Sequence, residues 1–101
     1  MSQDVSNDKD RDDPVAQCIL EAVAQKPDVS PEDVARIFAE SKRRPNAHQP
    51  RDAWRRYLMA VRQQAIHLAR QGRIEITRRG ETVDPDDFKG VIRLRLPRGG
   101  E

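Results

Sequence analysis

Apolar residues recur three or four positions apart in three segments of the chain, as they do on one face of an amphipathic helix. The first segment runs from Pro14 to about Gln25, the second begins at Pro31, and the third runs from about Arg51 to Gln71. The apolar positions are Val15, Cys18, Ile19, Ala22 and Val23, then Val34, Ile37 and Phe38, then Trp54, Leu58, Val61, Ala65 and Leu68. The pattern therefore predicts three helices, each with one buried face.

Residues that favour helix ends stand at the ends of these segments. Asp13-Pro14 and Ser30-Pro31 are each typical of an N-cap followed by proline at the first helical position. Asp33 follows Ser30 at the spacing of a capping box, in which each side chain accepts a hydrogen bond from the backbone NH of the other residue. Gly72 follows the third segment, where helices commonly end in a left-handed residue.

After the third segment the apolar period changes to two, which indicates strands. The alternation predicts one strand from Arg73 to Thr77 and another from Val91 to Leu96, paired as a two-stranded antiparallel hairpin. Arg93 and Arg95 on the outer face of the second strand are expected to lie opposite Glu75 on the first.

Three helices followed by a C-terminal hairpin are the chain order of a winged helix, an α+β fold in which the loop between the strands forms the wing. That loop begins at Arg78-Arg79-Gly80 and includes a turn at Asp84. Val29, between the first two helices, is a candidate for a short additional strand. The expected core consists of Val15, Ile19, Val23, Val34, Ile37, Phe38, Trp54, Leu58, Val61, Leu68, Ile74, Ile76, Ile92 and Leu94.

The chain of 101 residues is long enough for one domain. We expect residues 13–97 to form the winged-helix domain, residues 1–12 a disordered acidic tail, and residues 98–101 a disordered C-terminus. No apolar run reaches the roughly 18–20 residues of a membrane span, and the acidic N-terminus is unlike a signal peptide. A cytoplasmic protein without a membrane partner is therefore expected.

Few residues suggest chemistry. The single cysteine, Cys18, excludes an internal disulfide and a cysteine-based zinc site, and its position on a helix face favours burial. His48 and His67 have no neighbouring ligand pattern. The turn around Asp84 lacks the ligand register of a calcium loop. Since no phosphate-binding glycine loop, activated nucleophile or carboxylate pair is recognisable, we expect no enzymatic activity, small-molecule substrate, cofactor or metal.

Charge is distributed unevenly along the chain. Residues 42–79 contain eleven Lys and Arg against two acids, a balance of +9, whereas the whole chain carries a net charge of +2. A concentrated basic segment is typical of proteins that bind nucleic acid. Fifteen of the nineteen basic residues are Arg, as an Arg-favouring genome would also produce. Such a bias explains Arg over Lys but not the local scarcity of acids.

The basic segment covers the third helix, the loop before it and the entry to the wing, which are the parts of a winged helix that approach duplex DNA. Arginine can contact phosphates or bond guanine, and glutamine can bond adenine. The candidate contact residues are Arg43, Arg44, Arg51, Arg55, Arg56, Gln63, Arg70, Arg78 and Arg79. We therefore predict non-catalytic nucleic-acid binding, to duplex DNA, with limited sequence readout.

An alternative prediction is a protein-interaction module of the same fold that binds no nucleic acid. Met59 and Ile66 lie beside the polar face of the third helix and away from its main apolar stripe, so a partner protein could cover them. The segment of about eleven residues before this helix is also longer than the usual turn of roughly 3–4 residues in a helix-turn-helix. Fold alone does not decide between the two functions.

The chain also resembles a known family. The residues that carry the resemblance are Trp54-Arg55, Met59, Val61-Arg62, Gly72-Arg73-Ile74-Glu75-Ile76-Thr77, Gly80, Val83-Asp84-Pro85 and Gly90 through Leu94. They resemble a family of small bacterial proteins known as domain of unknown function 3253, over roughly residues 14–97. The resemblance implies a winged-helix-like fold and a bacterial, cytoplasmic setting, and it implies no activity.

Overall fold

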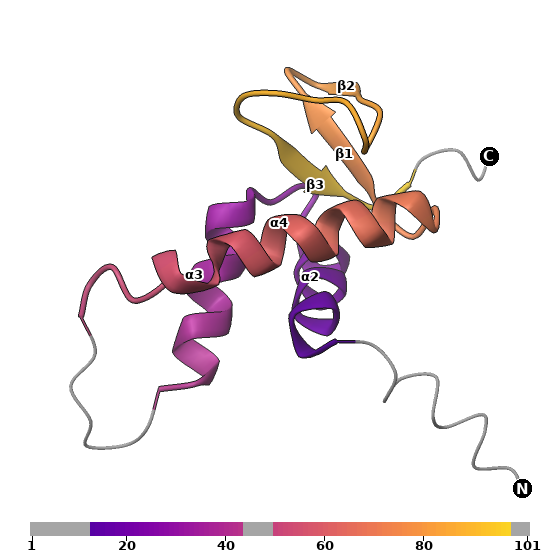
Figure 1. Cartoon of the computed structure of the whole chain (residues 1–101). Coiled ribbons are helices and arrows are strands. Elements are labelled where there is room, and N and C mark those ends of the chain that lie inside the picture. The colour runs from indigo at the N-terminus through magenta and orange to yellow at the C-terminus, as the bar shows by residue number, and fades with distance from the viewer. Residues whose placement is uncertain (1–12, 44–49, 98–101) are drawn as a thin grey trace, which may run out of the picture.

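The computed structural model describes residues 13–43 and 50–97 of the chain. Within them, three helices precede a small antiparallel sheet of three strands (Figure 1). The elements are α2 (Pro14–Gln25), α3 (Pro31–Ser41), α4 (Arg55–Arg70), β1 (Glu75–Arg78), β2 (Glu81–Thr82) and β3 (Arg93–Arg95). This α+β arrangement confirms the predicted fold class and is consistent with a winged-helix-like fold. The predicted tails at residues 1–12 and 98–101 lie outside the described residues.

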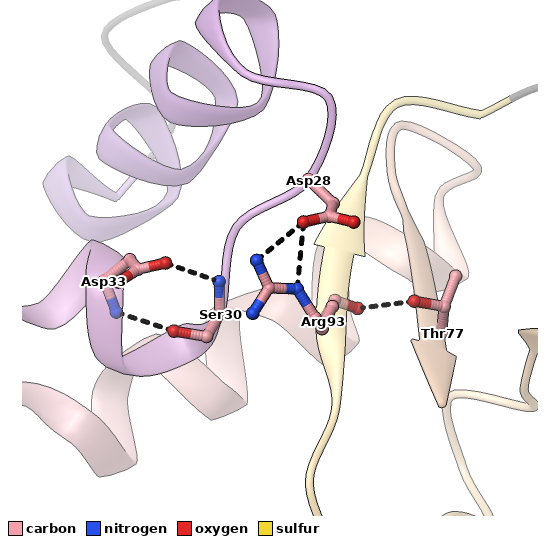
Figure 2. Close-up of polar contacts among 5 residues, drawn as sticks. All are labelled: Asp28, Ser30, Asp33, Thr77 and Arg93. Carbon is pink, nitrogen blue, oxygen red and sulfur yellow. Dashed lines mark hydrogen bonds and ion pairs between the residues drawn. The ribbon is translucent and has the colours of Figure 1, made fainter. Parts of the chain in front are cut away.

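The first two helices begin at the predicted caps. Asp13 Oδ1 accepts a hydrogen bond of 2.7 Å from the backbone NH of Val15. At the start of α3, Ser30 Oγ accepts from the backbone NH of Asp33 at 3.0 Å, and Asp33 Oδ2 accepts from the backbone NH of Ser30 at 3.1 Å (Figure 2). The capping box is therefore complete, and it fixes where α3 begins.

The third helix starts later than predicted. The sequence predicts helix from Arg51, whereas α4 begins at Arg55, and Trp54 occupies its N-cap without a side-chain cap. Residues 51–54 form turns, in which the backbone NH of Ala53 donates to the Pro50 carbonyl at 3.1 Å. The apolar stripe of this helix begins only at Trp54, so the apolar period does not fix how far the helix extends before that residue.

The end of α4 agrees with the prediction. Gly72 has a φ of +77°, and its NH donates to the Ala69 carbonyl at 3.0 Å. The NH of Arg73 donates to the Leu68 carbonyl at 3.0 Å. These two bonds form a Schellman motif, which turns the chain from α4 into the sheet.

The sheet has one more strand than predicted. The strand order is β2-β1-β3, so β1 pairs on both edges and a two-stranded hairpin is an incomplete description. Arg79 and Gly80 join β1 to β2 with φ values of +56° and +85°. A positive φ at both central residues is what a two-residue type I′ turn requires. The sequence signal is weak because Asn-Gly or Asp-Gly usually fills such turns.

Val29 adds a short contact to the other edge of the sheet, as the sequence suggests. Its backbone NH donates to the Leu94 carbonyl at 2.9 Å, and the NH of Leu94 donates to the Val29 carbonyl at 2.7 Å. On its other side, Leu94 of β3 lies opposite Ile76 of β1. The segment between α2 and α3 is thereby tied to the C-terminal strand.

The core lies where α2, α3 and α4 meet the inner face of the sheet. Its buried apolar residues are Val15, Ala16, Ile19, Ala22, Val23, Val29, Val34, Ala35, Phe38, Val61, Ala65, Leu68, Ile74, Ile76, Ile92 and Leu94. Three of the predicted core positions differ. Ile37 is 44% exposed, and Trp54 and Leu58 are only half-buried at the edge of the core. Cys18 is likewise half-buried.

Candidate nucleic-acid interface

The basic residues at the start of α4 are exposed. Arg51 lies in the turn before the helix, so the predicted helix start at about Arg51 is wrong, while Arg55 and Arg56 are the first two residues of α4. The whole of α4 contains no acidic residue. Arg44 lies outside the described residues. Cations at a helix N-terminus oppose the helix dipole, so they cost some helix stability.

The Trp54 ring contacts one of these cations and a further arginine from α3. The guanidinium carbon of Arg55 lies 5.5 Å from the ring centroid of Trp54, and that of Arg36, on α3, lies 4.7 Å from the same centroid. Both distances are within the cation–π range of about 6 Å. Arg36 is absent from the predicted site because it lies outside the basic segment. Nothing in the sequence indicated that this exposed arginine on α3 would contact the Trp54 ring.

A second aromatic pair continues the same seam between α3 and α4. The rings of Phe38 and Tyr57 meet edge to face, with centroids 5.0 Å apart and planes at 79°. Lys42 Nζ lies 5.2 Å from the Phe38 ring centroid. We call the group Arg36, Phe38, Lys42, Trp54, Arg55 and Tyr57 the α3–α4 seam.

The solvent face of α4 carries polar residues and one large apolar side chain. Arg56 and Gln63 are exposed, as an interface requires. Met59, between them on this face, is 67% exposed, which agrees with its predicted availability to a partner protein. Ile66 is different: it is half-buried and packs against the core, so it offers less surface to a partner than Met59 does.

Two predicted contact residues are paired with carboxylates. Arg43 Nη1 lies 3.1 Å from Glu40 Oε2, one turn earlier in the chain. Arg70 donates from Nε to Asp86 Oδ1 at 2.7 Å and forms an ion pair with the same carboxylate through Nη2. Arg70 therefore links the end of α4 to the loop between β2 and β3. Its guanidinium has a structural partner already.

Arg78 and Arg79 are exposed where β1 turns into β2. A Cβ built on Gly90, whose φ is +87°, would lie 3.4 Å from Arg78 Nε, so the Arg78 side chain crosses the returning loop at this glycine. In Figure 1 this turn stands at the top of the sheet and the start of α4 stands at the far left, apart from it. The unpaired arginines thus form two groups.

Two arginines of β3 fix that strand to its neighbours. Arg95 Nε donates to Glu75 Oε1 at 3.0 Å, as predicted, whereas Arg93 does not face Glu75. Arg93 instead donates to Asp28 Oδ1 from Nε at 2.9 Å and from Nη2 at 2.6 Å (Figure 2). Asp28 lies in the segment between α2 and α3, so Val29 and Asp28 together fix that segment to β3.

Asp33 and Cys18, both in the described part of the chain, have shifted pKa values, and neither shift suggests catalysis. The hydrogen bond from the Ser30 backbone NH, with smaller help from the Ser30 hydroxyl and from Arg93, lowers the pKa of Asp33. Burial, with a smaller contribution from Glu21, raises the pKa of the Cys18 thiol, which disfavours its reactive thiolate form. Within residues 13–43 and 50–97, no group of three or more His, Cys, Asp and Glu could hold a metal ion.

The sequence matches a family model described as a protein of unknown function, DUF3253, over residues 12–97. The chain belongs to this family. The match begins just before the cap of α2 and ends just after β3, so it spans the whole described fold, including both groups of exposed arginines. No protein of curated function matched the chain. In the described part, no helix is long and apolar enough to cross a membrane.

Proposed function

We propose that this DUF3253 protein binds duplex DNA without catalysis, through the start of α4 and the β1–β2 turn. One observation carries the proposal. Among the described residues, no ion pair forms at Arg51, Arg55, Arg56, Arg78 or Arg79, while Arg43, Arg70, Arg93 and Arg95 are all paired with carboxylates. These five arginines lie in or next to the parts of a winged helix that approach DNA.

Phosphate contacts explain this arrangement better than base readout. Arginine donates to phosphate oxygens at any sequence, and such contacts set position and affinity but not specificity. Gln63 is the one exposed side chain on the α4 face that suits an adenine edge. The proposed binding is therefore largely independent of sequence and falls steeply with salt. The cytoplasmic setting expected from the sequence suits a DNA-binding protein.

Replacing Arg55 and Arg56 together by alanine tests the proposal. Each phosphate contact contributes about 0.9 to the slope of log affinity against log salt, so the double variant should flatten the slope by about 2. At physiological salt this corresponds to roughly 30-fold weaker binding on any duplex. The measurement is fluorescence anisotropy with two labelled duplexes of unrelated sequence at several salt concentrations.

A matched control removes a single charge elsewhere. Lys26 is exposed at the end of α2 and lies outside the proposed interface, so Lys26→Ala should keep the wild-type slope, whereas Arg55→Ala alone should lower it by about 0.9. An equal loss of slope in both single variants would mean that net charge matters and position does not. A wild-type affinity weaker than about 10⁻⁴ M at physiological salt would rule out DNA binding.

The exposure of Met59 favours a second candidate, a protein-interaction module. A side chain of this type at 67% exposure in the middle of α4 is common on surfaces that bind proteins. One variant tests whether Met59 contributes to DNA binding. Met59→Gln should leave duplex affinity within about two-fold if phosphate contacts dominate, because it changes no charge.

A further inference from the structure

Two cations converge on one indole where α3 meets α4. The guanidinium carbons of Arg36 and Arg55 lie 4.7 Å and 5.5 Å from the ring centroid of Trp54. These three side chains come from both helices, so the packing of α3 on α4 creates the cluster. Neither arginine forms an ion pair within the part of the chain that the structure describes.

The two guanidinium groups repel each other. Because the two carbons lie 4.7 Å and 5.5 Å from one ring centroid, they are at most about 10 Å apart, which does not exceed the screening length of about 10 Å. Glu40, one turn after Arg36 on α3, pairs with Arg43 at 3.1 Å. An anion placed between the two arginines would turn this repulsion into two attractions.

The Trp54 ring also orients the N–H donors of the two guanidinium groups. A guanidinium group that stacks on an aromatic face keeps its N–H donors at the edge, in the fork that matches phosphate oxygens. Stacking limits its rotation, so less side-chain freedom is lost when a ligand binds. The backbone NH groups here are not available: those of Arg55 and Arg56 donate to the Asp52 and Ala53 carbonyls at 3.0 Å and 3.3 Å.

We propose that Arg36 and Arg55, held against Trp54, form a binding site for a single phosphate group. Where that phosphate belongs to the backbone of duplex DNA, the site rests on the proposed function. It extends the interface from α4 onto α3, and it makes Arg36 a contact residue. Trp54 touches no phosphate itself and acts as a positioning residue.

Trp54 is the only tryptophan in the chain, so intrinsic fluorescence reports on this site alone. The experiment titrates the full-length protein with an unlabelled duplex while following Trp54 emission, and repeats the titration by anisotropy with a labelled duplex. We expect the emission of Trp54 to change along the same curve as the anisotropy. Inorganic phosphate at constant ionic strength forms a second arm, with no DNA present.

Arg36→Ala is the decisive variant. It should weaken duplex binding about five-fold at 0.15 M salt and lower the salt slope by about 0.9, as expected for one lost phosphate contact. Arg36→Lys keeps the charge but loses the planar fork, so it should keep the slope and still bind more weakly. Lys26→Ala removes one exposed charge outside the seam and should change neither quantity. Circular dichroism melting verifies that each variant is folded.

The outcomes separate this inference from the proposed function. If the duplex binds but Trp54 emission is unmoved, or if Arg36→Ala binds as tightly as wild type, the phosphate site is wrong and DNA binding stands. If the duplex does not bind but inorganic phosphate gives a saturating emission change that Arg36→Ala abolishes, the site stands with free phosphate as its ligand, and DNA binding is wrong. If neither ligand produces a response, both proposals are wrong.

Discussion

The two ends of α4 lie in different surroundings. At its C-terminal end the helix packs beneath the sheet, where Leu68 and Ile76 are fully buried and Arg70 is paired with Asp86. At its N-terminal end it packs on α3, where Trp54 is only half-buried and Arg55 has an aromatic ring but no carboxylate for a partner. The same helix thus joins a region of paired charges to one of unpaired charges.

This difference shows how to separate arginines that stabilise a fold from those available to a ligand. Near the sheet, each described arginine pair spans two elements: Arg70 joins α4 to the wing loop, Arg93 joins β3 to the segment before α3, and Arg95 joins β3 to β1. In the α3–α4 seam, Arg36 and Arg55 form no such bond in the described part. We expect mutations near the sheet to reduce stability and mutations in the seam to reduce binding.

The largest expected effect concerns the apolar contacts at the two ends of α4. Leu68→Ala should lower the free energy of unfolding by about 2–5 kcal/mol, because a fully buried leucine leaves a cavity. Trp54→Ala should cost less, about 2 kcal/mol, since the Trp54 side chain is only partly buried. Urea unfolding of both variants gives the comparison. A larger loss at Trp54 would show that the seam, and not the sheet region, anchors the helix.

The next effect concerns the ion pair that joins β1 and β3. The side chains of Arg95 and Glu75 are only 17% and 20% exposed, and Arg95 Nη2 also donates to Thr82 Oγ1 at 3.2 Å. Arg95→Ala should therefore lower stability by about 1–2 kcal/mol, which is more than an exposed ion pair contributes. The matched control is Arg55→Ala, for which we expect a change below about 0.5 kcal/mol. Equal melting temperatures for the two variants would remove the distinction between the regions.

The smallest effect concerns acid and the start of α3. Folding lowers the pKa of Asp33, chiefly through the hydrogen bond from the Ser30 backbone NH. A carboxyl group whose pKa is lower in the folded state stabilises the fold above its unfolded pKa of about 4. That contribution is lost as the pH falls through the lower, folded pKa. Thermal unfolding between pH 7 and pH 2.5 should therefore show a smaller acid-induced loss of stability in Asp33→Asn than in wild type.

A control for this prediction keeps the Asp33 carboxyl group and removes only the Ser30 hydroxyl. Ser30→Ala leaves the backbone NH that binds Asp33 but removes the hydroxyl at the N-cap, so it should cost about 0.5–2 kcal/mol at neutral pH. Most of the acid dependence should remain in this variant, because the backbone NH still donates. If Asp33→Asn loses stability with acid as steeply as wild type, other carboxyl groups control the acid response.

The elements that the sequence predicted correctly depend on contacts between near neighbours in the chain. The capping box of Ser30 and Asp33, the Asp13 cap and the Gly72 helix end each involve residues within five positions. Side-chain chemistry specifies such contacts directly. The start of α4 was placed wrongly because its N-cap, Trp54, makes no side-chain cap and no position of the apolar stripe precedes it.

The candidate site was predictable only in part. The run of basic residues identified Arg55, Arg56, Arg78 and Arg79 as exposed cations, and the structure places all four at the surface. The run of basic residues gave no indication of Arg36, which lies eighteen positions before Trp54 and contacts its ring only when α3 packs on α4. Likewise, charge along the chain did not show that Asp86 would pair with Arg70, sixteen residues earlier.

By itself, the sequence determined the three helices, the existence of the strands, the single core and the basic character of the third helix, because apolar period and charge are properties of the chain. The tertiary structure decided which arginines remain unpaired. An ion pair or a cation–π contact needs atoms within a few ångströms, and residues distant in sequence reach that distance only after the helices and the sheet pack together. The division between arginines that stabilise this fold and arginines left for a ligand is therefore a property of the packed molecule.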